Sequence, residues 1–325
     1  MHSTSVHRIL VCGLGSVGER HLNNLLQLGY DDVLLYRARG LPSNTAYANI
    51  PTFNRLGEAL EQRPTVALIC NPTHLHVPTA IACAKANCHL FIEKPLGDSL
   101  EGVNRLRQVL AAKRKHAMVG YMLRFHPCLI AIKKWVDSGS LGRPIWARSH
   151  WGEYLPGWHP DEDYRVGYAA LSEMGGGPTL TLSHDIDILL WLFGKVVEVS
   201  AMPNRASSLQ VNTEHGIDIL FKFETGITTN IHLNYFQRQA SRGLEIVGEK
   251  GSATFDYYQS KACLYVGEGP SPAEIVDLAP TFKRNDMFRD EISYFFQAIG
   301  EDRKPVPGIE EGEAVLDVAL RALGG

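Results

Sequence analysis

The sequence predicts an α/β protein of two domains, the first built on a doubly wound parallel sheet. The second is expected to be an α+β domain with a large, mostly antiparallel open sheet. The chain has 325 residues, which is more than a single hydrophobic core usually accommodates. Short apolar runs alternate with helical patterns in the first third, whereas strand patterns dominate residues 196–266. We therefore expect domains at residues 1–122 and 123–325.

The composition excludes several classes of protein. Lys and Arg total 32 against 35 Asp and Glu, a formal net charge of −3, so we expect no nucleic-acid partner. No apolar run reaches the ~18 residues of a membrane helix, and the first residues lack a signal-peptide pattern. The six cysteines form no Cys-x-x-Cys pair, which favours reduced thiols in a cytoplasmic protein.

In the first domain, continuous apolar runs indicate strands that are buried on both faces, as in a parallel sheet. Helical periodicity separates these runs, and Gly29 ends the first helical stretch. The expected strands are residues 8–12, 33–36, 66–70, 89–92 and 117–119, and the expected helices are residues 17–28, 77–86 and 100–112.

In the second domain, we expect helices at residues 127–136, 180–193, 288–299 and 311–323. An aromatic loop at 154–168 follows a strand at 144–151, and strands with glycine turns fill residues 196–266. These strands carry more apolar residues than a single layer of helices would be expected to cover. An apolar face left exposed in this way predicts a homodimer or homotetramer formed through the sheet. The apolar residues are Ile217, Ile219, Phe221, Phe223, Ile231, Leu233, Tyr235 and Phe236.

A glycine motif of the form G-x-G-x-x-G follows the first strand directly and begins the first helix. Its residues are Gly13, Gly15, Ser16, Val17 and Gly18. Such glycines allow a tight turn and a close approach to a pyrophosphate at the helix N-terminus. The alternative is a simple glycine turn, but the position inside a βαβ unit favours a Rossmann dinucleotide-binding domain.

The residue expected to contact the adenosine ribose is Arg37, at the end of the second strand, where no carboxylate is present. An arginine pairs with a 2′-phosphate, whereas a carboxylate would repel it. We therefore expect NADP(H) as the favoured cofactor and NAD(H) as the alternative. If Arg37 only belongs to a solvated basic loop, this preference disappears.

Two further loops follow strands at the carboxyl edge of the expected sheet, where ligands of open α/β sheets bind. Asn71, Pro72 and His76 lie in the first of them. His74 and His76 lack a third ligand nearby, so we expect a helix-entry loop beside the cofactor and no metal. Glu93 and Lys94 lie in the second loop, where a lysine is suited to proton transfer unless it is merely solvated surface.

A glycine triplet at residues 175–177 precedes His184, and Asp187 lies on the same helix face as that histidine. A histidine transfers the proton that leaves a hydroxyl when its carbon gives up a hydride. The alternative is a core histidine bonded to a backbone carbonyl.

Taken together and in this order, these motifs resemble the glucose–fructose oxidoreductase, inositol dehydrogenase and MocA family. The stretches 120–127, with Arg124, and 244–251 add to the resemblance. It implies that Lys94 and His184 are the catalytic pair, and that a sugar, polyol or nucleotide sugar is oxidised or reduced. With the need for a sharp turn after a strand, it also predicts a cis Lys94–Pro95 bond. Many members carry an aspartate four residues before the histidine, where this chain has Leu180, with Thr181 beside it.

For the substrate, we expect aromatic surfaces that face a sugar and arginines that hold an anionic group. Ordinary packing and surface arginines are the alternative. The expected substrate-binding residues are Arg124, Tyr154, Trp158, Tyr164, Arg165 and Thr181. Two other functions stay open: a non-catalytic NADP-sensing regulatory protein on the same fold, and a sugar hydrolase or epimerase that uses transient oxidation with tightly bound cofactor.

Overall fold

The structure is a computed structural model, and it describes residues 7–38 and 47–324. The chain forms two compact units. The first comprises residues 1–121 and 288–314, and the second comprises residues 122–287 and 315–325. The first break lies after residue 121, and the chain returns to the first unit at residues 288–314, a return that the expected boundary at residue 122 did not include.

The first unit is built on a parallel sheet, which within the described ranges has six strands in the order β3-β2-β1-β4-β5-β6. The expected doubly wound sheet is therefore confirmed. Nearly all side chains of its central strands are buried, because helices cover both faces. The strands are β1 (Ile9–Cys12), β2 (Val33–Tyr36), β3 (Thr52–Phe53), β4 (Val66–Ile69), β5 (His89–Glu93) and β6 (Ala117–Gly120).

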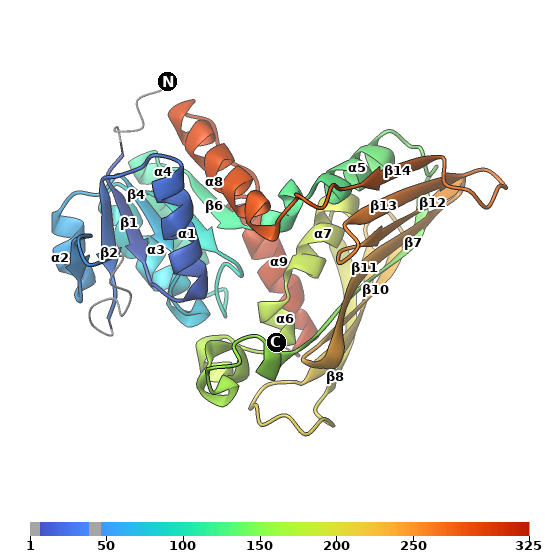
Figure 1. The fold of residues 1–325 in the computed structure, drawn as a ribbon, viewed down its shortest axis with the longest axis horizontal. Coiled ribbons are helices and arrows are strands. Elements are labelled where there is room, and N and C mark those ends of the chain that lie inside the picture. Colours follow the sequence, from blue (N-terminus) through green and yellow to red (C-terminus); the bar gives the residue numbers. More distant parts are fainter. Residues whose placement is uncertain (1–6, 39–46, 325) are drawn as a thin grey trace. The chain divides into compact units, whose positions relative to one another are not determined.

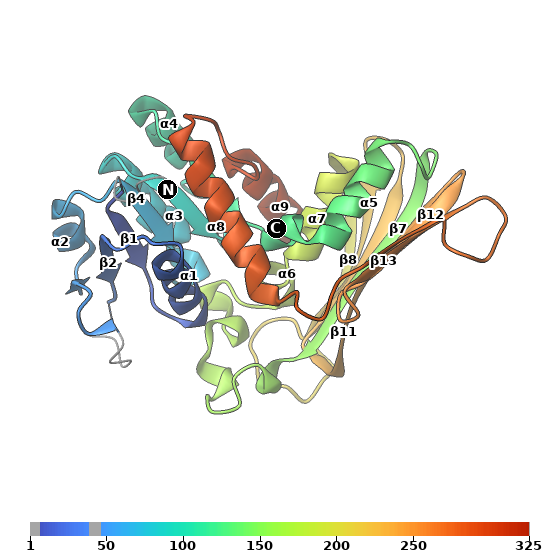
Figure 2. The same ribbon diagram turned by 45° about the horizontal axis from the view of Figure 1, so that its top comes forward.

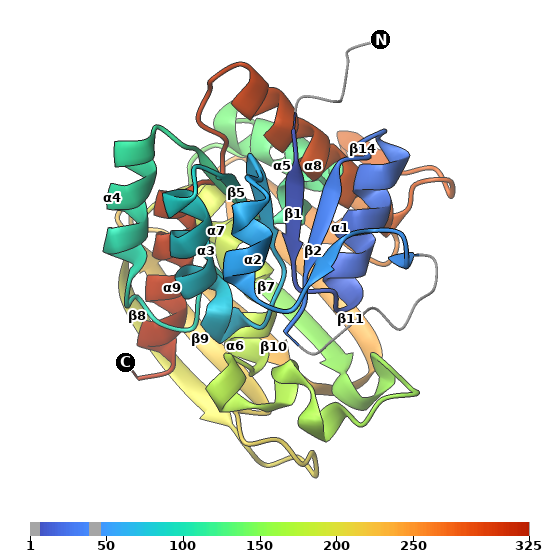
Figure 3. The ribbon, with the colours of Figure 1, turned by 90° about the vertical axis from the view of Figure 1, so that its left-hand side faces the viewer.

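Helices α1 and α8 lie on one face of this sheet, and helices α3 and α4 lie on the opposite face (Figure 3). Aromatic contacts hold α8 against α1 and β5: Phe288 packs against His21, and Phe295 packs against Phe91. The helices of this unit are α1 (Ser16–Gln27), α2 (Leu56–Glu61), α3 (His76–Lys85), α4 (Val103–Lys113), most of α8 (Arg284–Gly300) and the start of α9 (Ile309–Ala322).

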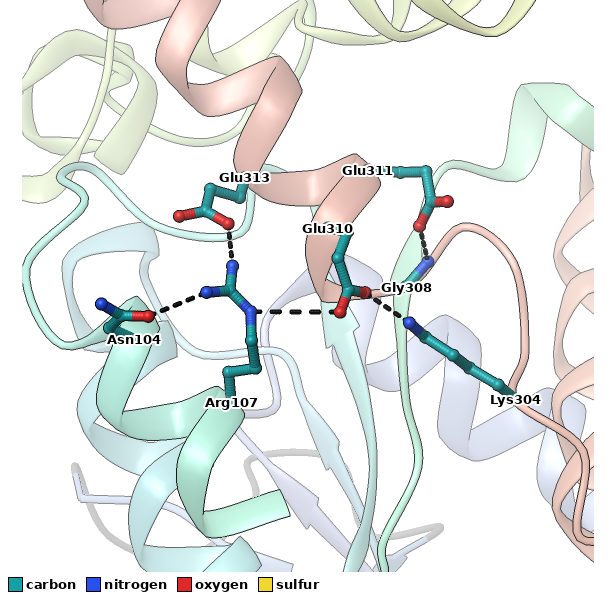
Figure 4. Close-up of polar contacts among 7 residues, drawn as sticks. All are labelled: Asn104, Arg107, Lys304, Gly308, Glu310, Glu311 and Glu313. Atoms are coloured by element: carbon teal, nitrogen blue, oxygen red, sulfur yellow. Dashed lines mark hydrogen bonds and ion pairs between the residues drawn. The ribbon is translucent and has the colours of Figure 1, made fainter. Parts of the chain in front are cut away.

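A polar network joins α9 to α4 (Figure 4). The guanidinium of Arg107 in α4 pairs with Glu313, and its Nε lies 3.9 Å from a carboxylate oxygen of Glu310. Lys304 also pairs with Glu310, at 2.7 Å. Glu311 accepts the backbone N–H of Gly308 at 2.7 Å, which satisfies a donor at the start of the helix. The first turns of α9 are thus fixed to the first unit, although the helix continues into the second.

The second unit is built on a sheet with strand order β14-β13-β12-β11-β7-β10-β9-β8, eight strands within the described ranges. All neighbours are antiparallel except β7 and β10, so the expected open, mostly antiparallel sheet is also confirmed. The strands are β7 (Pro144–Tyr154), β8 (Val196–Asn204), β9 (Gly216–Phe223), β10 (Thr228–Asn234), β11 (Phe236–Gly248), β12 (Gly251–Asp256), β13 (Lys261–Val266) and β14 (Glu274–Asp277).

Helices α5 (Pro127–Asp137), α6 (Pro178–Thr181) and α7 (His184–Phe193) pack on one face of this sheet (Figures 1 and 2). The apolar residues that we expected to remain uncovered by helices lie mainly on this covered face. Ile217, Ile219 and Phe221 alternate with Asp218 and Leu220, and only the first three are buried. Ile231, Leu233 and Tyr235 are likewise buried within the chain, so the premise that one helix layer cannot cover them was wrong.

Several elements differ from the sequence prediction. Strand β3 and helix α2 were not predicted, because a strand of two residues and a helix of six have too few residues to show a period. The single helix expected after the glycine triplet is two helices, α6 and α7, that are separated at Leu182 and Ser183. The Lys94–Pro95 bond is cis, as predicted. In the described part of the chain, no helix is long and apolar enough to cross a membrane.

Candidate cofactor-binding and catalytic residues

The glycine motif forms a turn that places open space at the N-terminus of α1. Gly13 has φ +99°, and a Cβ there would lie 2.7 Å from the backbone of Cys70 and Asn71. A Cβ on Gly18 would collide with the backbone oxygen of Gly13. At Gly15, the residue before α1, a Cβ would meet nothing within 4 Å. This turn fits a pyrophosphate, which needs close backbone approach, free space and the N–H groups at the start of a helix.

Arg37 follows the last residue of β2, and its backbone N–H donates to the carbonyl of Phe53 at 2.9 Å. Its side chain is half-buried. This is the place at which a dinucleotide fold contacts the adenosine ribose. The other basic residue of this stretch, Arg39, lies outside the described ranges, as do residues 40–46. The structure therefore defines the position of Arg37 alone.

Hydrogen bonds of Asn71 and His76 hold the loop after β4 in place. Asn71 donates from its amide to the hydroxyl of Thr79 at 2.8 Å. His76 is buried, with Nε2 2.8 Å from the carbonyl oxygen of Asn71 and Nδ1 2.8 Å from that of Pro95. Burial lowers the pKa of His76, whereas the two carbonyls act in the opposite direction. Both ring nitrogens of His76 therefore lie within hydrogen-bond distance of backbone carbonyl oxygens, one in the loop after β4 and one in the loop after β5. The neutral ring has a single N–H and donates to one of these oxygens at a time.

Glu93 and Lys94 stand at the end of β5. One carboxylate oxygen of Glu93 lies 2.6 Å from Nε2 of His21, and the other accepts the backbone N–H of Lys94 at 3.2 Å. His21 is fully buried in α1. Burial raises the pKa of Glu93, but the hydrogen bond from His21 and the charges of His21, Lys94 and His76 outweigh it, so the net shift is downward. Glu93 is accordingly an ionised group beside the half-buried Lys94.

In the second unit, His184 is the first residue of α7 and is buried. Its ring centroid lies 6.1 Å from that of Trp151. The guanidinium of Arg242 stacks on Trp151 at 3.7 Å and bonds to Asp185 at 2.5 Å. Ser149 donates to the other oxygen of Asp185 at 2.6 Å. These contacts fix the start of α7, and with it His184, against β7 and β11.

Arg124 does not have a free charge for an anionic substrate. Its guanidinium makes two hydrogen bonds to Asp187, at 3.0 and 2.7 Å, and its side chain is only 8% exposed. The guanidinium also lies over the ring of Trp191, 5.6 Å from its centroid. The Asp187 side chain, which shares a helix face with His184, is therefore directed to Arg124.

Trp158 packs against a residue that the sequence did not single out as part of a site. Tyr235 is fully buried, and its ring meets the edge of the Trp158 ring with 5.5 Å between the centroids. The side chain of Thr181 lies near the Tyr235 hydroxyl. Burial raises the pKa of Tyr235 well above its ordinary value. The indole Nε1 of Trp158 is a buried donor without a protein acceptor, which a hydroxyl-rich ligand would satisfy.

Of the other expected substrate residues, Tyr164 and Arg165 share a contact with Gln210, whereas Tyr154 contacts Arg238. The Tyr164 hydroxyl accepts the backbone N–H of Gln210 at 3.2 Å, and Arg165 bonds to the Gln210 side chain at 3.1 Å. Arg165 also pairs with Asp163, and its side chain is 54% exposed. Tyr154 lies beneath the guanidinium of Arg238 at 4.3 Å. Among the described residues, no group of three or more His, Cys, Asp or Glu side chains is arranged to hold a metal ion.

Glu214 was not predicted from the sequence. It is buried, and one of its carboxylate oxygens accepts both the backbone N–H and the hydroxyl of Thr179, at 3.0 and 2.6 Å. A Cβ on Gly177 would lie 2.7 Å from the carboxylate of Glu214, so this position requires glycine. The only signal in the sequence is a carboxylate shortly before a strand, which begins at Gly216.

Comparison with known proteins identifies both parts of the chain. Residues 7–121 match the model described as "Oxidoreductase family, NAD-binding Rossmann fold". Residues 129–254 match the model described as "GFO/IDH/MocA C-terminal domain". The nucleotide-binding model matches the N-terminal part of the chain and the C-terminal-domain model matches the part that follows it.

Curated relatives and solved structures agree with these two family matches. The chain is 25% identical to the myo-inositol 2-dehydrogenase of Thermotoga maritima, over 95% of this chain and 93% of that protein. It is 26% identical to the levoglucosan dehydrogenase of Pseudarthrobacter phenanthrenivorans, over 58% of this chain and 54% of that protein. The structure of a levoglucosan dehydrogenase in complex with NADH superposes with a TM-score of 0.83 at 20% identity, covering 97% of this chain and 96% of that chain.

The UDP-N-acetylglucosamine 3-dehydrogenase of Acidithiobacillus ferrooxidans has the same fold, with a TM-score of 0.79 at 21% identity over 97% of this chain and 96% of that one. The glycine turn, the Lys94 strand end, the order of the two sheets and the two family matches all lead to one assignment. The chain belongs to the Gfo/Idh/MocA family and is an oxidoreductase with an NAD-binding Rossmann domain.

Proposed function

We propose that this protein transfers a hydride between a nicotinamide cofactor and a CH–OH carbon of a sugar, polyol or nucleotide sugar. The observation that supports the proposal is the position of the glycine turn and of Lys94 in the first unit. The open glycine turn follows β1 and Lys94 follows β5, so both stand at the carboxyl edge of the same parallel sheet. Ligands of open α/β sheets bind at that edge. The names of the relatives supply the substrate class.

In this proposal, Lys94 binds and polarises the reacting oxygen, and His184 takes up or returns the hydroxyl proton. A bound nicotinamide supplies or accepts the hydride. The positive charge of Lys94 favours the alkoxide character that the oxygen acquires when its proton leaves. A histidine suits proton exchange at neutral pH because its ordinary pKa is near 6.5.

The cofactor contacts in the proposal come from the loops of the first unit. Residues 13–18 bind the pyrophosphate, Arg37 pairs with a 2′-phosphate, and Asn71 and Pro72 border the cofactor site. NADP(H) is the favoured cofactor for this reason. Glu93 and His76 border the same site, and their hydrogen bonds are made within the protein itself.

The substrate contacts in the proposal come from the second unit. Trp158, Tyr154 and Tyr164 offer aromatic surfaces, and Thr181 and Trp158 offer polar atoms for sugar hydroxyls. Arg165 is half exposed and is suited to an anionic group. Arg124 is proposed to hold the Asp187 side chain in place on α7, because the two opposite charges form a buried ion pair.

The test is a screen of cofactor reduction over sugars, polyols, uronates and nucleotide sugars, with both NAD and NADP. On the substrate found, Lys94→Ala and His184→Ala should each lower turnover by ~10²–10⁴, the usual scale of acid–base catalysis. Binding of the reduced cofactor should stay within about threefold. His74→Ala is the matched control and should keep normal turnover. Near-normal turnover of both catalytic variants would contradict the assignment.

A further inference from the structure

The backbone of Lys94 is held from both sides by buried histidines of the first unit. On one side, His21 is bonded to Glu93, whose second oxygen accepts the Lys94 N–H. On the other side, His76 is bonded to the carbonyl of Pro95. His21 is 0% exposed and His76 is 2% exposed. Lys94 thus stands between two residues that are each fixed by a buried ring.

Each histidine also connects Lys94 to an element that borders the cofactor site. His21 lies in α1, three residues after the last glycine of the motif. The second nitrogen of His76 lies 2.8 Å from the carbonyl oxygen of Asn71, and a Cβ on Gly13 would touch that same residue's backbone. The glycine turn, the loop after β4 and the end of β5 are therefore joined through two imidazole rings.

We propose that His21 and His76 are positioning residues that hold Lys94 for the reaction. The inference rests on the proposed function, in which Lys94 touches the reacting oxygen. A misplacement of a catalytic group by about 1 Å costs on the order of 10²-fold in rate. Short bonds from buried rings restrict such displacement, because a broken bond would leave a buried polar group without a partner.

This inference also explains why Glu93 is buried beside a catalytic lysine. Its carboxylate is a bridge: it receives a bond from His21 in α1 and a bond from the Lys94 backbone. Burying a carboxylate is costly unless it is paired and hydrogen-bonded. His21, with its ring packed against Phe91 and Phe288, provides a rigid partner for that carboxylate.

The experiment uses His21→Gln and His76→Gln in the full chain. His74→Gln and His89→Gln are matched controls, because the first lies in the loop before α3 and the second at the opposite end of β5. Each of the two test variants should lower kcat by ~10–100-fold and leave the KM for the cofactor within about threefold. The controls should keep normal kcat.

A double-mutant cycle with Lys94→Ala separates positioning from general damage. If the histidines act through Lys94, adding either variant to Lys94→Ala should change turnover by less than about twofold. Multiplicative losses in that background would overturn the proposal. So would an equal loss of kcat in the His74 and His89 controls.

A second readout does not need turnover. Amide hydrogen exchange at Lys94, followed by NMR, should be at least ~10-fold faster in His21→Gln and His76→Gln and unchanged in the two controls. Unchanged exchange in the test variants would overturn the proposal. If Lys94→Ala itself keeps turnover, the proposed catalytic role fails, while the exchange rates still decide whether the histidines hold this segment.

Discussion

Arg37 determines which form of the cofactor we expect to bind more tightly. A charge-assisted contact between arginine and phosphate contributes ~1.5–3 kcal/mol, so NADPH should bind about 10–100-fold more tightly than NADH. Arg37→Ala should reduce that ratio to below about threefold. Fluorescence titration of both reduced cofactors measures it. Arg55→Ala, at a side chain that is 80% exposed, is the control and should keep the wild-type ratio.

At the scale of single residues, the sequence predicted local motifs well and distant partners poorly. Gly13 to Gly18 form one turn, so their role can be inferred from spacing alone. His21 meets Glu93 across 72 positions, and this contact exists only once α1 packs on the sheet. The pairing of Arg124 with Asp187, 63 positions apart, was missed for the same reason, and Arg124 was instead expected to bind substrate.

At the scale of elements, Glu214 fixes the short helix α6 that leads to His184. Its carboxylate satisfies two donors of Thr179 in a buried place. Glu214→Ala should lower the free energy of unfolding by about 2–3 kcal/mol, because both donors lose a charged acceptor. Glu214→Gln keeps an acceptor oxygen and should cost less. Urea unfolding of the three proteins checks this order, and equal losses in both variants would contradict it.

His126 makes the start of α5 sensitive to acid. Its Nδ1 accepts the backbone N–H of Cys128 at the helix N-terminus, which requires that nitrogen to be unprotonated. Burial, with a smaller effect of Arg242, lowers the pKa of His126 to about 4. The unfolded chain, with an ordinary histidine pKa near 6.5, then takes up the proton first. The stabilising contribution is complete above pH ~6.5 and is lost as the pH falls toward 4.

His126→Asn tests this prediction, because asparagine also accepts at a helix N-cap and does not titrate. Between pH ~6.5 and 4, the unfolding free energy of the wild type should fall more steeply than that of the variant. The difference between the two profiles isolates His126 from His89, whose pKa is also lowered to about 4 by burial. Parallel profiles would show that His126 does not contribute.

At the scale of the whole molecule, we still predict a homodimer or homotetramer through the large sheet, although the supporting residues have changed. Outward-facing side chains of β8, β9 and β14 include Met202, Leu220 and Ile275, which are 76%, 61% and 49% exposed. Charged cross-strand pairs such as Lys222 with Glu198 lie among them. A face of this mixed kind is typical of an interface between subunits.

Light scattering after size exclusion should give a mass of two or four chains at micromolar concentration. Leu220→Glu should shift the protein toward smaller species, because it places a charge in the expected interface. Leu26→Glu, at an exposed apolar residue of α1, is the control and should leave the mass unchanged. A wild-type protein of monomeric mass would contradict the prediction.

The sequence also predicted the two sheets and their order, because buried parallel strands and half-covered antiparallel strands have different hydrophobic patterns. It did not predict that residues 288–314 return to the first unit. The helical pattern of α8 shows that one of its faces is apolar, but this pattern carries no information about which sheet that face covers. That choice depends on the complementarity of Phe288 and Phe295 with α1 and β5.

This return has a consequence for protein synthesis. The ribosome completes all six strands of the first sheet well before it reaches α8, with the second sheet made in between. Until then, Phe91 and Tyr30 lack the aromatic partners Phe295 and Phe296. The nascent first unit therefore emerges with an uncovered aromatic surface, and exposed apolar surface of this kind makes folding intermediates prone to aggregate. Its maturation is completed only when nearly the entire chain has been translated.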